Sequence, residues 1–213
     1  MRSYEQYCAV AKALDVVGDR WTLLIVRELI VRGPSRYTDL RYGLPGIATN
    51  LLADRLNDLE TAGLVRRFDA PPPVATALYE LTPRGAELGP VLQALGRWGG
   101  RLMTQIGDDD EFRSHWLAFP VSTYLQDRSP DEPPVTIEVR TGDQTVSIET
   151  VDGGVRLRPG AAERADAILS GPPDAILGVL TGRIDVAKAK RRGLRLQGDE
   201  RVLLRVRPET PPA

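Results

Sequence analysis

The segment from Arg36 to Leu64 reads RYTDLRYGLPGIATNLLADRLNDLETAGL, and its pattern decides the fold of the N-terminal half. It predicts a short helix over residues 37–42, a turn over Gly43–Gly46 and a second helix over about 49–61, with leucines at helical spacing. Glycine accepts unusual φ angles and proline cannot continue a helix, which favours the turn. Gly63 stands where a helix end favours a left-handed residue. The segment is therefore predicted to be a helix-turn-helix, whose second helix is shaped for a DNA major groove.

A β-hairpin is predicted directly after this segment. Residues 64–68 and 78–81 carry strand patterns, and three consecutive prolines exclude regular structure between them. Such a hairpin is the wing of a winged-helix domain. Thr82-Pro83 then starts a helix, with Thr as N-cap and Pro at the first helical position, and we expect this helix to reach Gln105. Its apolar stripe, wide enough to pack against another subunit, comprises Leu88, Val91, Leu92, Leu95, Trp98 and Leu102.

Composition limits the class of protein. The 213 residues are 42% hydrophobic and 27% charged, as in a soluble globular protein of one or two domains. No apolar run is long enough to span a membrane and the N-terminus has no signal-peptide core, so a cytoplasmic protein without membrane insertion is expected. Cys8 is the only cysteine and His115 the only histidine, which excludes an internal disulfide and a Cys/His zinc cluster. We expect no cofactor, although carboxylate-only metal sites remain open.

The net charge of −1 divides unevenly along the chain. Through Thr104 there are 13 basic and 11 acidic residues, a net charge of +2, and the remainder holds 15 and 18, a net charge of −3. The positive half is the one with the helix-turn-helix, and almost all of its basic residues are arginines, which suit phosphate and guanine contacts.

A domain boundary is expected near Gly107, which divides the chain into residues 1–107 and 108–213. The second part has a strand-rich and then helix-rich pattern, so the whole chain is predicted to be α+β. Helices are predicted at residues 111–125, 173–180, 186–191 and 199–205, and strands at 135–140, 144–150, 155–158, 167–170 and 194–197.

The first half resembles the HxlR family of winged-helix transcriptional regulators, relatives of the MarR regulators. The resemblance covers about Tyr7 to Met103 and implies a homodimer that binds palindromic double-stranded operator DNA, with an effector or redox signal changing that binding. It rests on Cys8, VGDRWTLLI at 17–25, YTDL at 37–40, PGI at 45–47, LADRL at 52–56, LETAGL at 59–64 and YELT at 79–82.

The second half resembles a sterol-carrier-protein-type-2-like domain over about Glu111 to Val206. The resemblance implies a mixed fold with an apolar cavity for a small apolar or lipid-like ligand. Trp116, Phe119 and Tyr124 are the candidate ligand-binding residues, and the alternative is that these aromatic side chains belong to the core. The resemblance rests on LTGRI at 180–184, Ala187, Gly193, Leu194, Leu196 and Gly198-Asp199.

The second helix of the predicted motif supplies candidate base readers. A helical wheel buries its three leucines and exposes Asn50, Asp54 and Asn57, flanked by Thr49, Ala53 and Asp58. Asparagine amides can bond adenine bidentately, whereas the alternative is that these residues only solvate a surface helix. Asp54 either accepts a hydrogen bond from cytosine or orients Arg55 or Arg36 toward phosphates. Ala48 has no hydroxyl group, so Thr49 is expected to supply any side-chain cap.

Arginines outside that helix are candidates for phosphate contacts. Arg36 precedes the first helix of the motif, where it either meets the DNA backbone or is only solvated. Arg66 and Arg67 alternate along a strand, so one of them at most faces DNA. Residues 70–77 hold no Lys or Arg, which argues against insertion of the wing into a minor groove.

Cys8 lies where redox-sensing members of the resembling family keep their sensor thiol. A single thiol can form an intersubunit or mixed disulfide. Lys12, one helical turn away, would favour the thiolate. The alternative is a small, buried and inert cysteine.

The predicted function is a DNA-binding regulator modulated by a ligand of the second domain. In the alternative, the chain carries a lipid or small molecule and its winged helix serves dimerisation or protein contacts. No catalytic constellation is recognisable, so an enzyme is not expected. Lys188, Lys190, Arg191 and Arg192 form a basic cluster, which either meets an anionic head group or is a solvated face.

Overall fold

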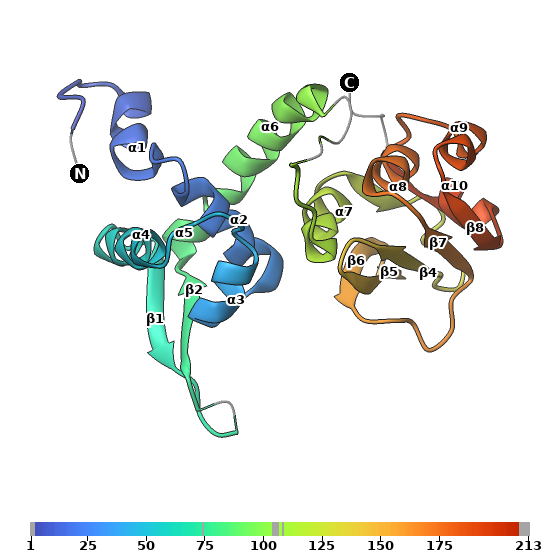
Figure 1. The fold of residues 1–213 in the computed structure, drawn as a ribbon, viewed down its shortest axis with the longest axis horizontal. Helices are drawn as coiled ribbons and strands as arrows, with labels where there is room; N and C mark the ends of the chain where they lie inside the picture. Colours follow the sequence, from blue (N-terminus) through green and yellow to red (C-terminus); the bar gives the residue numbers. More distant parts are fainter. Residues whose placement is uncertain (1–2, 74, 104–106, 108, 209–213) are drawn as a thin grey trace. The chain divides into compact units, whose positions relative to one another are not determined.

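The computed structural model describes residues 3–73, 75–103, 107 and 109–208. Its contacts divide the chain into two units, residues 1–95 and 96–213. The division falls inside helix α6 (Gly89–Gly99; Figure 1), whereas the sequence predicted a boundary further along the chain, near Gly107. Within the described ranges, no helix is both long and apolar enough to cross a bilayer.

The N-terminal unit has the predicted winged helix-turn-helix. Strand β1 pairs with β2 in antiparallel register, Val65 opposite Leu81, and Ser35 adds a bridge to Tyr79. Figure 1 shows this hairpin projecting from the helices of the unit. Before α6, the elements are α1 (Ala9–Val17), α2 (Thr22–Arg32), α3 (Tyr37–Tyr42), α4 (Thr49–Thr61), β1 (Val65–Asp69), β2 (Ala77–Leu81) and α5 (Pro83–Ala86).

The glycines of the motif act in two different ways. Gly46 and Gly63 have φ angles of 82° and 70°, in the left-handed region that favours glycine, as predicted. Gly43 has an ordinary φ of −76°, so the prediction that its conformational freedom forms the turn is wrong. A Cβ at Gly43 would overlap Oε2 of Glu28. Gly43 is therefore needed for its small size.

The single long helix predicted from Pro83 to Gln105 is interrupted. The expected cap is present, because the Thr82 hydroxyl oxygen accepts a hydrogen bond from the Gly85 N–H at 3.1 Å. Helix α5 nevertheless ends at Ala86, and α6 begins at Gly89. Pro90 explains the break, since it has no N–H group and disfavours the helical conformation in the residue before it. After α6 a 3-10 turn, η1, covers Gly100–Leu102, and residues 104–106 lie outside the described part.

The C-terminal unit is built on a mixed five-stranded sheet of order β6-β5-β4-β7-β8, in which only β4 and β7 are parallel. The predicted helix at 111–125 begins only at Ser114, and the antiparallel pair β3–β9 was not predicted. The elements are η2 (Ser114–Leu117), α7 (Ala118–Tyr124), β3 (Leu125–Asp127), β4 (Thr136–Thr141), β5 (Gln144–Val151), β6 (Gly154–Pro159), β7 (Ala167–Ser170), α8 (Pro173–Leu180), α9 (Val186–Arg191), β8 (Arg195–Gly198), α10 (Arg201–Arg205) and β9 (Val206–Pro208).

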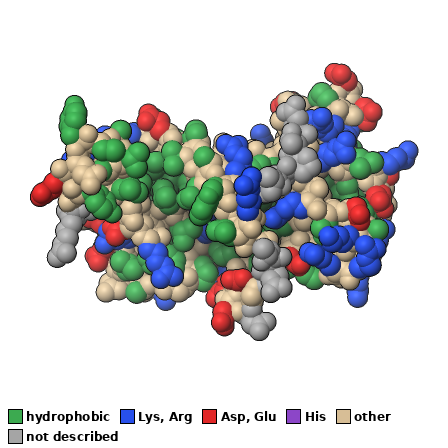
Figure 2. Space-filling model, turned by 90° about the horizontal axis from the view of Figure 1, so that it is seen from above, with side chains coloured by type: hydrophobic (Ala, Val, Ile, Leu, Met, Phe, Trp, Pro, Cys, Tyr) green, Lys and Arg blue, Asp and Glu red, His purple; other side chains and the backbone are tan. Residues whose placement is uncertain are grey.

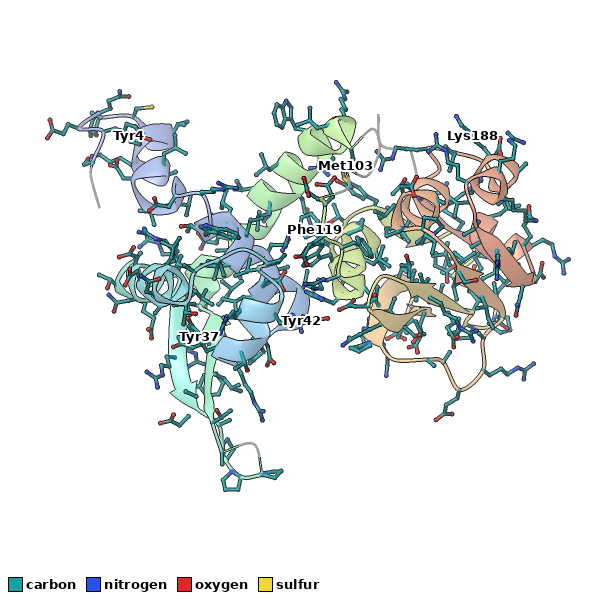
Figure 3. All side chains as sticks on the ribbon, viewed as in Figure 1. Tyr4, Tyr37, Tyr42, Met103, Phe119 and Lys188 are labelled. Atoms are coloured by element: carbon teal, nitrogen blue, oxygen red, sulfur yellow. The ribbon has the colours of Figure 1, made fainter. Side chains whose placement is uncertain are left out.

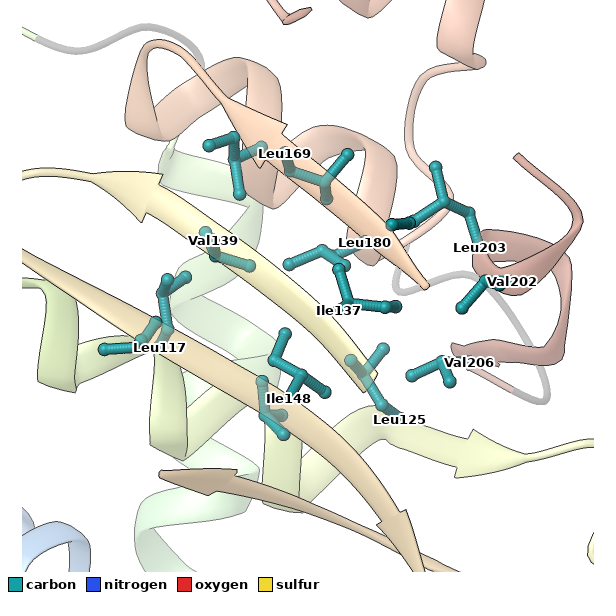
Figure 4. Packing of buried hydrophobic residues seen from close by; sticks show 14 of the residues in the cluster. Leu117, Leu125, Ile137, Val139, Ile148, Leu169, Leu180, Val202, Leu203 and Val206 are labelled. Atoms are coloured by element: carbon teal, nitrogen blue, oxygen red, sulfur yellow. The ribbon is translucent and has the colours of Figure 1, made fainter. Parts of the chain in front are cut away.

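One face of this sheet forms the core of the C-terminal unit. Ile137, Val139, Ile148 and Leu169 are completely buried there, packed among apolar side chains of η2, α7, α8 and α10 (Figure 4). Alternate residues of β4 turn to the opposite, polar face, where the Arg140 guanidinium lies 2.6 Å from the Glu138 carboxylate. The strand alternation thus separates an apolar interior from a charged sheet surface.

Candidate nucleic-acid interface

Helix α4 presents the predicted residues on its exposed face. Leu52, Leu56 and Leu59 are buried against the unit, so the other side of the helix faces solvent. The exposed residues of that side are Thr49, Asn50, Ala53, Asp54 and Asn57. Asn50 and Asn57 lie on one exposed face of one helix, and a helix placed in a major groove can present such side chains to base edges.

The N-terminus of α4 has no side-chain cap. Ala48 is the N-cap residue and no side-chain cap is present, so the prediction that Thr49 caps the helix is wrong. The Tyr37 hydroxyl instead donates a hydrogen bond to the Thr49 carbonyl, which ties α3 to the first turn of α4 (Figure 3). The first N–H groups of a helix without a side-chain cap can bind an anion such as a phosphate.

Arg55 forms ion pairs with residues other than Asp54, its predicted partner. Its guanidinium pairs with Asp19, and with Asp58 at 2.8 Å, so the prediction that Asp54 orients Arg55 is wrong. Asp19 precedes Arg55 by 36 residues, a partner that local spacing could not reveal. The Arg36 side chain is exposed, with no ion pair among the residues that the structure describes. Arg55 thus stabilises the unit, while Arg36 can still meet a phosphate.

The two wing arginines differ in their partners. Arg66 pairs with Glu80 across the hairpin and lies over the Phe68 ring, 5.7 Å from its centroid. The exposed Arg67 side chain has no ion pair in the described part of the chain, and its backbone N–H donates to the Glu60 carboxylate at 3.1 Å. Arg67 therefore carries the uncompensated positive charge of the wing.

A buried carboxylate supports the turn before α4. Glu28 is 0% exposed, and its two oxygens lie 2.7 Å from Nη2 of Arg27 and 3.1 Å from Nε of Arg32. Arg27 also donates to the Gly43 carbonyl at 3.2 Å. The sequence patterns did not identify Glu28 as a structural residue, although it lies on the apolar stripe of α2, three residues after Ile25. A charged residue at such a position is the signal that could have revealed it.

Cys8 is exposed and stands at the N-cap of α1, so the alternative of a buried thiol is wrong. The nearby backbone N–H groups of Ala11 and Val10 lower the pKa of the Cys8 thiol. Lys12 instead pairs with Asp15 at 3.6 Å, so the backbone replaces the predicted role of Lys12 in favouring the thiolate.

Cys8 should therefore react with iodoacetamide in the native protein. The pH at which the alkylation rate reaches half its maximum should lie below the ordinary thiol pKa of about 8.5. The pH dependence of the alkylation rate, followed by mass spectrometry, measures this. A thiol that reacts only after denaturation would contradict the expectation.

A polar cavity of about 690 Å³ lies beside α4 in the N-terminal unit. The N-terminal segment at Ser3 and Tyr4 forms one wall, and α4 forms another. Four aspartates line the cavity with a single arginine, which does not suit an apolar or lipid-like ligand. Within the described ranges, no group of three His, Cys, Asp or Glu side chains could hold a metal ion.

The three predicted ligand-binding aromatic residues occupy two places in the C-terminal unit. Phe119 and Tyr124 both approach Gly96, at 3.0 Å and 3.5 Å from the position of a Cβ there. Trp116 instead packs edge to face against Phe112, with ring centroids 6.2 Å apart. All three are half-buried, and Figure 3 shows Phe119 among the side chains of α7. Burial raises the pKa of the Tyr124 hydroxyl.

Comparisons with known proteins match the N-terminal half. The family model described as HxlR-like helix-turn-helix matches residues 16–106. The HTH-type transcriptional regulator YvaP of Bacillus subtilis is 34% identical over 87 residues, covering 41% of this chain and 80% of YvaP. The regulator sll1512 of Synechocystis sp. is 36% identical over 98 residues, 46% of this chain and 72% of the relative. The solved reduced form of the transcriptional regulator YodB from B. subtilis is 31% identical, covers 48% of this chain and all of YodB, and has a TM-score of 0.40.

Proposed function

Because the chain belongs to the HxlR-like helix-turn-helix family of transcriptional regulators, we propose that it binds operator DNA as a homodimer, with α4 of each copy in a major groove. The observation that carries the proposal is the exposed face of α4, on which Asn50 and Asn57 stand free of the core. Two copies related by a two-fold axis would read a palindromic operator. The relatives' names support a regulator rather than an enzyme, and a cytoplasmic location belongs to the same proposal.

Phosphate contacts are proposed for three groups around α4. The first N–H groups of the helix lack a side-chain cap, and the side chains of Arg36 and Arg67 are exposed cations. Such contacts fix the register of a protein on DNA, while base contacts provide specificity. Thr49, Ala53 and Asp54 complete the proposed surface by their position beside the asparagines.

Exposed apolar side chains on α6 support the dimer. Val91 and Leu95 are about half exposed and Trp98 is 67% exposed, and the sequence pattern assigned all three to a stripe that could pack against another subunit. Tyr7, Val10 and Leu14 on or beside α1 are likewise exposed. Since exposed large apolar side chains favour burial against a partner, a second copy of this chain is the proposed partner.

The C-terminal unit is proposed to be sterol-carrier-like and to bind a small apolar or lipid-like ligand that modulates DNA binding. The mixed sheet with helices over its apolar face supports the resemblance noted from the sequence. The ligand would have to displace packed side chains near Phe119 and Tyr124. Redox sensing at Cys8 is proposed as a second input, supported by the exposure of the thiol and its lowered pKa.

Replacing Asn50 or Asn57 with alanine tests the base-reading proposal. Each substitution should weaken operator binding by about 1–3 kcal/mol, or roughly five-fold to 150-fold, because a bidentate contact to a base is lost. Gel shifts with DNA from around the protein's own gene measure the effect. Thr61→Ala is a matched control, since Thr61 is exposed at the far end of α4. Unchanged binding in both asparagine variants would contradict the proposed reading face.

A further inference from the structure

We propose that the basic segment of the C-terminal unit, residues 183–195, makes a second, sequence-independent contact to the phosphates of DNA flanking the operator. The inference rests on the proposed DNA-binding function and extends it to the half of the chain outside the winged helix. Its starting point is the separation of charge within the C-terminal half.

Positive charge in the C-terminal half is concentrated in one short segment. Residues 183–195 read RIDVAKAKRRGLR, with six basic side chains and only Asp185 acidic. The other residues after Thr104 hold 9 basic and 17 acidic side chains. A segment with a net charge of +5 therefore lies in surroundings with a net charge of −8. Figure 2 shows Lys and Arg side chains gathered over the C-terminal unit.

The basic side chains of residues 188–192 are exposed and weakly compensated, whereas the Arg183 guanidinium donates hydrogen bonds to the Gly100 carbonyl at 3.0 Å and to the Thr181 hydroxyl at 3.4 Å. Lys190 lies 3.5 Å from Glu200 and Arg192 lies 3.9 Å from Asp174, and both are exposed pairs, which contribute little in water. Lys188, labelled in Figure 3, and Arg191 are exposed and have no ion pair in the described part of the chain. The charge of the basic segment therefore remains available to an external anion.

The arrangement on α9 has a cost that a polyanion would remove. Lys188 and Arg191 are three residues apart on a helix, and like charges at that spacing repel each other. Asp185 is the only acidic residue of the segment. Its carboxylate caps α9 by accepting a hydrogen bond from the backbone N–H of Lys188 at 2.6 Å.

The apolar residues of the segment argue for DNA rather than a lipid surface. Ala189 and Leu194 are buried, and Ile184 and Val186 pack against the core of the unit. A helix that lies on a membrane needs an exposed apolar face to enter the lipid, and α9 offers none of its large apolar side chains. The segment presents charge alone, which matches the phosphate backbone of DNA.

The test compares full-length protein with the variant Lys188→Gln/Arg191→Gln over a salt series, on operator fragments with short and long flanks. Each lost phosphate contact should reduce the slope of log K against log salt by about 1, so the double variant should lose about 2 on long fragments. The affinity gained from longer flanks in the wild-type protein should also be lost. The charge-preserving variant Lys188→Arg/Arg191→Lys should keep both the wild-type salt slope and the affinity gained from longer flanks.

Arg156→Gln/Arg164→Gln is the matched control, because it removes the same charge from two exposed residues that, like Lys188 and Arg191, have no ion pair in the described part of the chain. A control that reduces the slope as much as the test variant would overturn the proposal, as would a test variant with the wild-type slope. If the wild-type protein binds no DNA, the proposed function itself fails. Binding to anionic lipid vesicles that depends on Lys188 and Arg191, with DNA binding unchanged, would also overturn it in favour of a membrane partner.

Discussion

Replacing Glu28 with glutamine should lower the free energy of unfolding of the N-terminal unit by about 3 kcal/mol, because it removes the charge from a buried ion-pair group. Glu28 is completely buried, and the guanidinium groups of Arg27 and Arg32 share its carboxylate. The amide keeps the shape of the side chain but removes the negative charge that the Glu28 carboxylate supplies to both arginines. Urea denaturation followed by circular dichroism measures the loss.

Glu80→Gln is the control for that experiment. Glu80 pairs with Arg66 at the surface of the wing, where the loss of an ion pair costs under about 1 kcal/mol. A Glu28 variant that unfolds at the same urea concentration as the Glu80 variant would contradict the assigned role. Because Arg27 also holds the Gly43 carbonyl in the turn before α4, the Glu28 variant should bind operator DNA more weakly even where it remains folded.

Replacing Arg205 with methionine should have a comparable effect on the C-terminal unit, about 3 kcal/mol, because a buried carboxylate loses its partner. The Arg205 guanidinium donates to both oxygens of Asp127 at 2.7 Å and 2.8 Å, and to the carbonyls of Glu132 and Pro133. The two side chains are 8% and 2% exposed. Arg201→Met is the control, since Arg201 is exposed and pairs with Asp199 at the surface.

The same pair predicts a pH dependence with a definite sign. Hydrogen bonds from Arg205 lower the pKa of the Asp127 carboxyl below its ordinary value. Its contribution to stability is therefore present above the unfolded-state pKa of about 3.9 and is lost as the pH falls through the lower folded-state value. The difference between wild type and Arg205→Met should shrink over that range. A difference that stays constant from pH 7 to pH 2.5 would contradict the role of the pair.

Local patterns predicted the helix-turn-helix well because each of its signals is short. The leucine spacing of α4, the left-handed Gly63 and the Thr82 cap all act within one or two helical turns, and each is present as expected. The buried and exposed sides of α4 follow from the same spacing. The parts of the sheet with alternating patterns, β4 to β7, were predicted for the same reason.

The features that sequence reasoning missed depend on distant partners or on packing. Arg55 pairs with Asp19 from the turn before α2, so its position on the α4 wheel could not assign its role. The three-residue strands β3 and β9 pair with each other although they are far apart in the sequence, and neither is long enough to show an alternating pattern. Gly43 is required by the buried Glu28 carboxylate, which is visible only once α2 and the turn are packed.

Footprinting of the full-length protein on DNA from around its own gene, over a salt series and beside the Asn50→Ala variant, shows whether two copies of α4 bind an operator. We expect two protected half-sites centred about 10 bp apart, or a multiple of that distance, as two copies of α4 on a two-fold axis require. Protection should weaken as salt rises and disappear in the variant at concentrations that protect with wild type. Absence of protection at low salt, or equal protection by both proteins, would contradict this expectation.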